Sequence, residues 1–405
     1  MEVVVPARIP GHNCGREQHE EAASAVFSFN GLARSLCLRF IALLMTTAEM
    51  VIDMADQPQE FTDKIKASLR EVLPEATEEV DEWVEEKRPL LLALFAESVA
   101  NDLNKNQAAL IKGIYRDLAG FQRRLLATWR EPLHRLDSLI HMCMEVGDDI
   151  NKEYRLNANA APSSRRNVTT RLHTRAVQVS NEISCLLKGG YPDGAMARWR
   201  SLHETTVMLA FLAEHDEDLS KRFTDYQKIQ RLRHAVQFNK HHAVLGFEPI
   251  PETDISRYRL EFDNAVEQYG KNFKEENGWA TQLFNKPKVT FRDIEEFVEM
   301  SYLRPQYGFA SKNVHSGIDS IGYKLGLSMS GKDILLAGPS NEGLIEPIQC
   351  TSFSLVSATS ELISTSPTED REVMETVLWK WHDLIKDEVL RASDALKEKG
   401  DAASK

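Results

Sequence analysis

Apolar residues recur at steps of three and four positions along most of this chain, and that spacing constrains the fold more than any other feature of the sequence. In the segment 105–128, for example, Leu110, Ile114 and Leu118 are four residues apart and so fall on one face of a helix. No alternation of strand segments with helix segments accompanies this pattern, as it does in α/β proteins. The spacing predicts an all-α fold: a multi-helix bundle-like core with an N-terminal helical extension and a long C-terminal helix.

The bounds of the expected helices follow from this spacing and from the residues that interrupt it. The helices cover residues 76–103, 105–128, 131–153, 164–188, 193–215, 217–244, 252–270, 290–302, 305–326, 349–364 and 367–399. Pro89 is expected to interrupt the first helix, and Pro367 to stand in the first turn of the last. Ser163 or Ser164 is expected to cap the helix over 164–188. Residues 334–343 form the one segment expected to hold a short strand or an irregular loop.

A compositional shift near residues 157–164 divides the chain. We expect a poorly structured leader over residues 1–53, an N-terminal helical region over 54–160, a central helical domain over 161–366 and a C-terminal helix and tail over 367–405. The leader lacks sustained periodicity, so a second interpretation is that translation starts at Met45, Met50 or Met54 and that the residues before it are not part of the protein.

Composition limits the class of protein and its cell compartment. The five cysteines are odd in number and include no Cys-x-x-Cys pair, which favours a reduced compartment and argues against a zinc site. No apolar run reaches the roughly 18 residues of a membrane helix. We therefore expect a cytoplasmic protein that does not enter the membrane. The phosphate-loop, dinucleotide and zinc-protease motifs are absent, so no cofactor and no metal is expected.

The most unusual charged residues lie on the helix that follows a glycine turn. Gly189-Gly190 is expected to end one helix and Asp193 to cap the next, which carries Arg200 and Glu204. Arg200 and Glu204 are four residues apart and therefore share one face of a helix that continues into an apolar run. Arg175, on the preceding helix, could join them in a helical hairpin. A structural ion pair and part of a functional site are both open interpretations.

A second polar line is expected further along the chain. Tyr307, Ser311 and His315 are spaced four residues apart and would follow one face of a helix. Histidine titrates near neutral pH and Tyr or Ser can donate a proton, so the line suits proton transfer. It suits structural hydrogen bonding equally well. Arg200, Glu204, Tyr307, Ser311 and His315 are the candidate catalytic residues.

Positive charge is concentrated in the middle of an otherwise acidic chain. The net charge is −12, but residues 150–242 hold 15 Lys and Arg against 9 Asp and Glu, a net of +6. A basic region of this kind either pairs with its acidic flanks or attracts a polyanion such as RNA. The candidate polyanion contacts are Arg175, Arg222, Arg231, Arg233 and Lys240.

Two of these segments carry a resemblance to a known family. The run LLKGGYPDGAMARWRSLHETTVMLAFL, followed by Arg222-Phe223 and then by YGFASKNVHSG, resembles a bacterial domain family of unknown function over about residues 165–330. The resemblance implies a helical fold and no activity. A more distant similarity is to HEPN-type ribonucleases, whose metal-free site has an arginine and a later histidine with four to six residues between them. Here Arg304 stands eleven positions before His315, with Pro305 between, which departs from that pattern.

Two classes of function remain open from the sequence, and it does not decide whether the chain is an enzyme. The first is a binding or scaffold protein with a buried polar site, in which Trp379 and Trp381 would anchor a partner. The second is a HEPN-like, metal-independent ribonuclease in a toxin or phage-defence setting. In that case His315 would act as general acid or base, Arg200 would stabilise phosphate charge and Glu204 would orient the arginine. RNA, a protein partner or a second copy are the partners considered.

Overall fold

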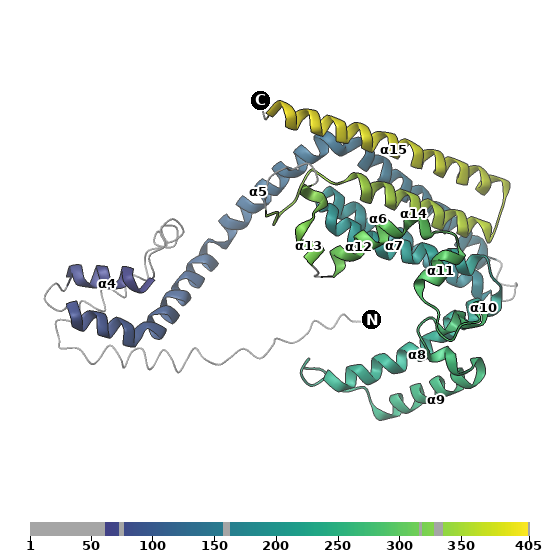
Figure 1. Ribbon diagram of the computed structural model, residues 1–405, viewed down its shortest axis with the longest axis horizontal. Helices are drawn as coiled ribbons and strands as arrows, with labels where there is room; N and C mark the ends of the chain where they lie inside the picture. The colour runs from purple at the N-terminus through teal and green to yellow at the C-terminus, as the bar shows by residue number, and fades with distance from the viewer. Residues whose placement is uncertain (1–60, 73–76, 157–162, 316–317, 328–334, 404–405) are drawn as a thin grey trace. The chain divides into compact units, whose positions relative to one another are not determined.

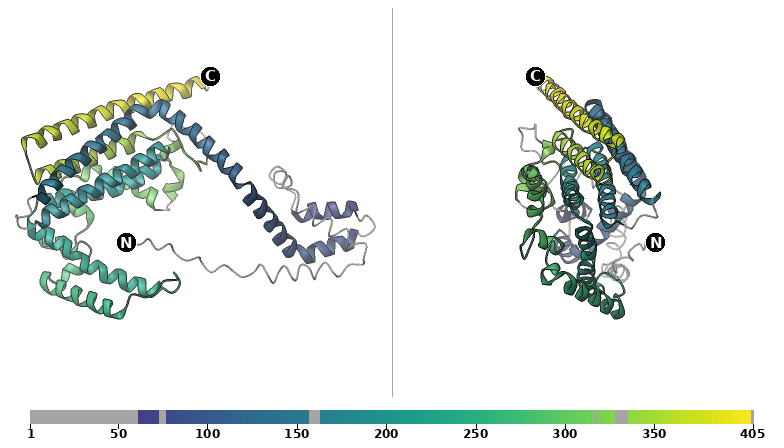
Figure 2. Two further views of the ribbon diagram at one scale, coloured as in Figure 1. Left: turned by 180° about the vertical axis from the view of Figure 1, so that it is seen from behind. Right: turned by 90° about the vertical axis from the view of Figure 1, so that its right-hand side faces the viewer.

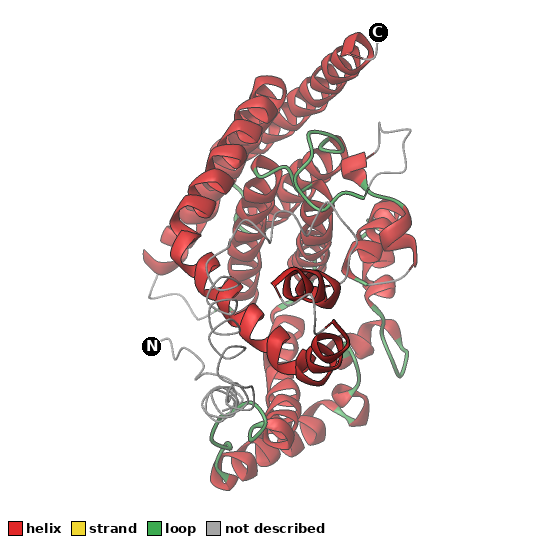
Figure 3. Cartoon of the chain, turned by 90° about the vertical axis from the view of Figure 1, so that its left-hand side faces the viewer, coloured by secondary structure: helices red, strands yellow, loops and turns green. Residues whose placement is uncertain are grey.

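The computed structural model describes residues 61–72, 77–156, 163–315, 318–327 and 335–403. These ranges contain helices and loops and no strand, which confirms the predicted all-α fold (Figure 3). The expected leader over residues 1–53 lies outside the described ranges. Of the helices in these ranges, none is both long and apolar enough to cross a bilayer.

Twelve α-helices and four 3-10 helices follow one another along the described ranges, and Figure 1 labels the α-helices. The α-helices are α4 Phe61–Val72, α5 Thr77–Leu156, α6 Ser164–Lys188, α7 Pro192–Ala213, α8 Glu217–His241, α9 Glu252–Tyr269, α10 Thr281–Phe284, α11 Phe291–Phe297, α12 Arg304–Val314, α13 Ile318–Gly322, α14 Ile345–Ser364 and α15 Glu369–Ala403. The 3-10 helices are η2 Lys271–Lys274, η3 Gly278–Ala280, η4 Ser301–Leu303 and η5 Leu325–Leu327.

The described residues fall into two compact units, which meet in the sequence between Leu118 and Ala119. In the first, Ile65 and Leu69 of α4 pack against Val80 and Val84 of α5, and Leu91 completes this small core. The four-part division predicted from composition remains a prediction.

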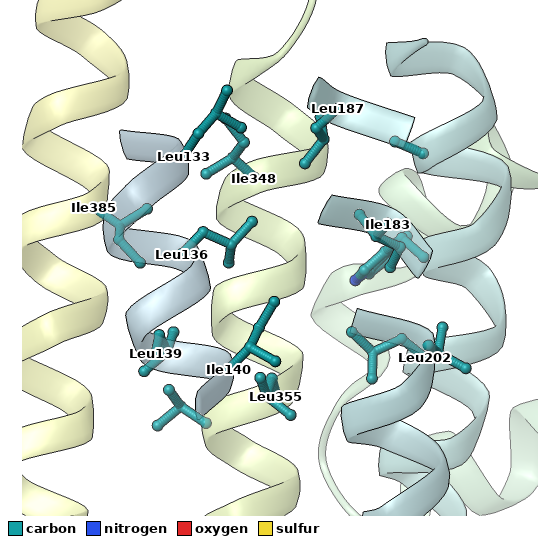
Figure 4. Close-up of a cluster of buried hydrophobic side chains, with 14 of the residues drawn as sticks. Leu133, Leu136, Leu139, Ile140, Ile183, Leu187, Leu202, Ile348, Leu355 and Ile385 are labelled. Carbon is teal, nitrogen blue, oxygen red and sulfur yellow. The ribbon is translucent and has the colours of Figure 1, made fainter. Parts of the chain in front are cut away.

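The main core of the second unit lies among α6, α7, α14, α15 and the second half of α5. Buried side chains from all five helices form one cluster in which Leu133 and Leu136 of α5 approach Ile348 of α14 and Ile385 of α15 (Figure 4). Helices α14 and α15 pack side by side, as both views of Figure 2 show in yellow-green and yellow. The two tryptophans expected to anchor a partner form hydrogen bonds within this unit. Trp379 Nε1 donates to Ser360, and Trp381 Nε1 donates to the carbonyl of Arg135.

A second core joins the end of α7 to α8, α9, α11 and the short turns between residues 270 and 284. Phe211 lies fully buried there, with its ring centre 5.8 Å from that of Trp279. Tyr226 and Phe273 pack edge to face in the same cluster. The long helix pair α8 and α9 is thereby attached to the end of α7.

The N-terminal helices differ from the prediction. Separate helices over 76–103, 105–128 and 131–153, with an interruption near Pro89, are wrong because α5 runs unbroken from Thr77 to Leu156. Proline removes one backbone hydrogen bond from a helix interior and costs about 3 kcal/mol. Around Pro89 the helix keeps Val84 and Leu91 in one core. Around Pro132 the helix keeps Trp129 and Leu133 in the main core of the second unit. Packing of the residues that flank each proline therefore outweighs the cost of the proline itself.

The central helices agree better with the prediction. Ser163 caps α6 by accepting from the amide of Arg166, and Gly189 follows its last turn, both as expected. Asp193, in contrast, does not cap α7, whose N-cap residue is Tyr191. The single helix expected over 305–326 is also wrong, since α12 ends at Val314 and α13 and η5 follow separately. The segment 335–343 forms an irregular loop, one of its two expected forms.

Candidate functional site

Helix α7 carries the site, and a tight turn sets where it begins. Gly190 has a φ of +79°, and a Cβ there would lie 2.5 Å from the Phe121 ring of α5. Only glycine therefore fits the turn without a shift of that ring. Pro192 then occupies the first turn of α7, where its missing N–H costs nothing.

Arg200, Glu204 and Tyr307 are brought together, as the sequence allowed. Arg200 Nε lies 3.0 Å from Glu204 Oε1, and the Tyr307 hydroxyl donates to the same oxygen over 2.6 Å. The Arg200 guanidinium also lies 4.9 Å from the centre of the Tyr307 ring. One carboxylate on α7 thus holds both its own helix's arginine and the tyrosine of α12.

The Tyr307 hydroxyl acts in this arrangement as a hydrogen-bond donor that keeps its proton. Burial, and next the hydrogen bond to the Glu204 carboxylate, raise the pKa of Tyr307 to about 12. A phenol of that pKa does not serve as a base near neutral pH. The contact between α7 and α12 is therefore a lock of polar groups, which we call the α7–α12 lock: Arg200, Glu204 and Tyr307.

A second polar connection, which the sequence did not reveal, lies beside the lock. Glu295 of α11 is fully buried, and its two oxygens are 2.7 Å from His203 Nε2 and 2.7 Å from Arg304 Nη1. His203 stacks on Trp199 with ring centres 5.3 Å apart, and its Nδ1 has no partner among the described residues. The Arg304 guanidinium lies 5.1 Å from the Tyr307 ring, which joins the two connections.

His315 and Ser311 stand apart from this cluster. Helix α12 ends at Val314, and His315 follows it in an extended conformation with an exposed side chain. Eight residues of helix separate its Cα from that of Tyr307 by roughly 12 Å. The Ser311 hydroxyl donates to the Tyr307 carbonyl within its own helix. Of the three polar side chains predicted to share one helix face, therefore, only Tyr307 forms a hydrogen bond with Glu204 among the described residues.

The candidate polyanion contacts do not act as one set of exposed cations. Arg175 pairs with Glu182 at 3.6 Å, so it does not join Arg200 and Glu204. Arg231 pairs with Glu261, and Arg233 donates to the Lys274 carbonyl. Lys240 is exposed near the end of α8, whereas Arg222 is buried.

Asp193, the residue expected to cap α7, binds a distant part of the chain. Its two carboxylate oxygens accept from the backbone amides of Leu325 (2.9 Å) and Gly326 (3.2 Å) in η5. Charged acceptors make the stronger backbone hydrogen bonds. Two carboxylates of α7, Asp193 and Glu204, therefore hold η5 and α12 respectively.

A cavity of about 540 Å³ lies along α12, on the side where these two elements meet α7. Its lining residues come from α7, α12, α13, η5 and α14 and the loop between α13 and η5: Met196, Pro305, Gln306, Phe309, Lys312, Ile318, Gly322, Tyr323, Leu325 and Glu346. We call it the α12 cavity. The buried Oε1 of Gln306 accepts no hydrogen bond from any described residue. The described residues contain no group of three His, Cys, Asp or Glu side chains that could hold a metal ion.

Comparison with known proteins adds a family and no activity. A model described as a family of unknown function, DUF5677, matches residues 166–333. No curated protein and no solved structure matched the chain. The matched residues include Asp193, Arg200, Glu204, Glu295 and Tyr307. The match to this family of unknown function, DUF5677, thus covers the residues that carry the α7–α12 lock and most of the α12 cavity lining.

Proposed function

We propose that this chain is a binding protein whose ligand occupies the α12 cavity. The observation that carries the proposal is the lining of that cavity, in which apolar side chains such as Met196 and Phe309 stand beside the polar side chain of Gln306. Its volume of about 540 Å³ falls within the range of small-molecule sites, roughly 300–1,000 Å³.

The polar connections of α7 fit this function as supports of the cavity walls. Glu204 holds α12 through Tyr307, the residue next to Gln306, and Asp193 holds η5 at Leu325, itself a lining residue. Sites held by locked side chains bind more tightly because less ordering is required on binding. Asp193 and Glu204 would therefore affect ligand binding indirectly, by holding these walls in place.

The competing function is metal-independent RNA cleavage by Arg200, Glu204 and His315. It has less support because Arg200 and Glu204 pair with each other, and because His315 makes no hydrogen bond through its ring to a described residue of the cluster. A general acid or base must come within hydrogen-bond reach of the groups that it serves.

A reduced compartment such as the cytoplasm suits the protein, since Cys143, Cys185 and Cys350 are all free thiols.

Binding is tested with the neutral fluorescent probe N-phenyl-1-naphthylamine, which has an apolar body and one N–H donor. We expect saturable fluorescence enhancement by the full chain, and a loss of affinity of about three- to tenfold in Gln306→Leu, because a polar side chain of the cavity lining is removed. Tyr323→Ala, which removes an exposed wall of the cavity, is expected to weaken binding as well.

Tyr302→Ala is the matched control, because Tyr302 is similarly exposed (60% against 55% for Tyr323) but does not line the cavity. Equal affinities for Tyr323→Ala and Tyr302→Ala, with no effect of Gln306→Leu, would contradict the proposal. Degradation of total RNA without added metal by the wild type, lost in His315→Ala, would instead establish the ribonuclease.

A further inference from the structure

A second cavity, of about 580 Å³, lies between α8, the end of α9 and the turns that follow it. It is separate from the α12 cavity and shares no lining residue with it. The lining residues are Arg222, Tyr269, Gly270, Lys271, Asn272, Thr281, Gln282, Asn285, Lys286 and Pro287. Most of these side chains are polar, and no Asp or Glu of the described ranges is among them.

Arg222 is the buried charge of this cavity, with only 7% of its surface exposed. Its Nε donates to the Trp279 carbonyl over 3.1 Å, and its guanidinium lies 4.9 Å from the centre of the Tyr269 ring. Within the described ranges it forms no ion pair with a carboxylate. A buried cation without a counter-ion is costly unless something else supplies the negative charge. The ring and the carbonyl fix the guanidinium while its terminal nitrogens remain for a ligand.

The other charges around the cavity add to its positive potential. Lys271 is exposed on η2. Lys286 lies in the loop after α10, where it pairs with Asp293 at 2.6 Å. Asp225, the acidic residue bonded to the Tyr269 hydroxyl, is also paired with Lys228 at 2.7 Å. Three cationic side chains thus line one cavity, and two acidic residues beside it, Asp225 and Asp293, are already paired with Lys228 and Lys286.

We propose that this cavity binds the phosphate group of a small phosphorylated molecule. A phosphate monoester carries a charge of about −1.5 to −2 near pH 7. It therefore matches Arg222 and Lys271, the two lining cations that form no ion pair within the described ranges, better than the single charge of a carboxylate does. Arginine presents its N–H groups in a planar fork that suits phosphate oxygens. The volume leaves room for the rest of a small molecule, and the amides of Asn272, Gln282 and Asn285 line that space.

Isothermal titration calorimetry of the full chain tests the site with inorganic phosphate, ribose 5-phosphate, ribose and acetate. We expect binding of phosphate and tighter binding of ribose 5-phosphate, no binding of ribose, and weaker binding as NaCl is raised. Arg222→Gln should abolish phosphate binding. Lys271→Gln should weaken it by about two- to fivefold, the effect of losing one exposed ion pair.

Lys274→Gln is the matched control, since Lys274 lies in the same 3-10 turn and is exposed but does not line the cavity. It should bind phosphate as the wild type does. Because Arg222 is buried, the exposed Lys271→Gln variant keeps the test valid if Arg222→Gln fails to fold. Equal phosphate affinity for Lys271→Gln and Lys274→Gln, or acetate binding as tight as phosphate, would overturn the proposal. An RNA oligonucleotide that binds more tightly than ribose 5-phosphate would overturn the assignment to a small molecule.

Discussion

Replacement of Glu295 by alanine is expected to lower the free energy of unfolding by about 3–5 kcal/mol, the usual cost of removing one partner of a buried ion pair. The carboxylate is fully buried between His203 and Arg304. Without it, both ring nitrogens of the buried His203 would lack partners and the Arg304 guanidinium would lose its counter-ion. Urea unfolding followed by tryptophan fluorescence measures the change.

The neighbouring residue provides the control for this prediction. Glu296 is exposed and, among the described residues, its carboxylate pairs with Arg292, four residues away on the same short helix. Glu296→Ala is expected to change stability by no more than about 0.5 kcal/mol, as exposed helix pairs do. Similar losses for the two alanine variants would mean that the buried connection from α11 to α7 contributes little to the fold.

Trp199→Ala is expected to have the second large effect, a loss of about 3–5 kcal/mol in the free energy of unfolding. The indole of Trp199 is fully buried in the main core, and its Nε1 donates to the Cys350 carbonyl (2.9 Å) and to Ser354 Oγ (3.0 Å) of α14. Alanine would leave a cavity between α7 and α14 as well as two unpaired acceptors. Urea unfolding at constant pH measures this loss.

Trp199→Phe separates the two parts of that effect. Phenylalanine retains most of the buried ring but has no N–H, so the variant should lose about 1–2 kcal/mol, the cost of the unpaired acceptors and the smaller ring. A loss below about 1 kcal/mol in Trp199→Ala would contradict the assignment of this residue to the core between α7 and α14.

The helices that the sequence predicted well are those whose ends carry local signals. Helix α6 begins after Ser163 and ends at the glycine turn, and α9 starts and stops within a residue of its predicted bounds. The continuity of α5 could not be predicted, because the contacts that carry it across Pro89 come from α4 and depend on the tertiary fold. The end of α12 at Val314 could not be predicted either. Because of it, His315 does not share a helix face with Tyr307 and Ser311.

One half of the polar cluster could be predicted from the sequence. Arg200 and Glu204 share a helix face, a relation that spacing reveals, and Tyr307 was in the second candidate segment. Glu295 was missed because a glutamate in a short helix has no local pattern that distinguishes a buried carboxylate from an exposed one. Arg222 was grouped with surface cations for the same reason, since its burial under Tyr269 depends on how α9 packs on α8.

Glu204 and Tyr307 act together to hold α12 against α7, and this coupling is central to both the fold and the α12 cavity. The most direct test is a double-mutant cycle in urea unfolding with Glu204→Gln, Tyr307→Phe and the double variant. Because the two groups share a 2.6 Å hydrogen bond, a coupling energy of about 1.5–3 kcal/mol is expected, as for hydrogen bonds to charged groups. Losses that add to within about 0.3 kcal/mol, as those of independent sites do, would show that the two side chains do not form the α7–α12 lock.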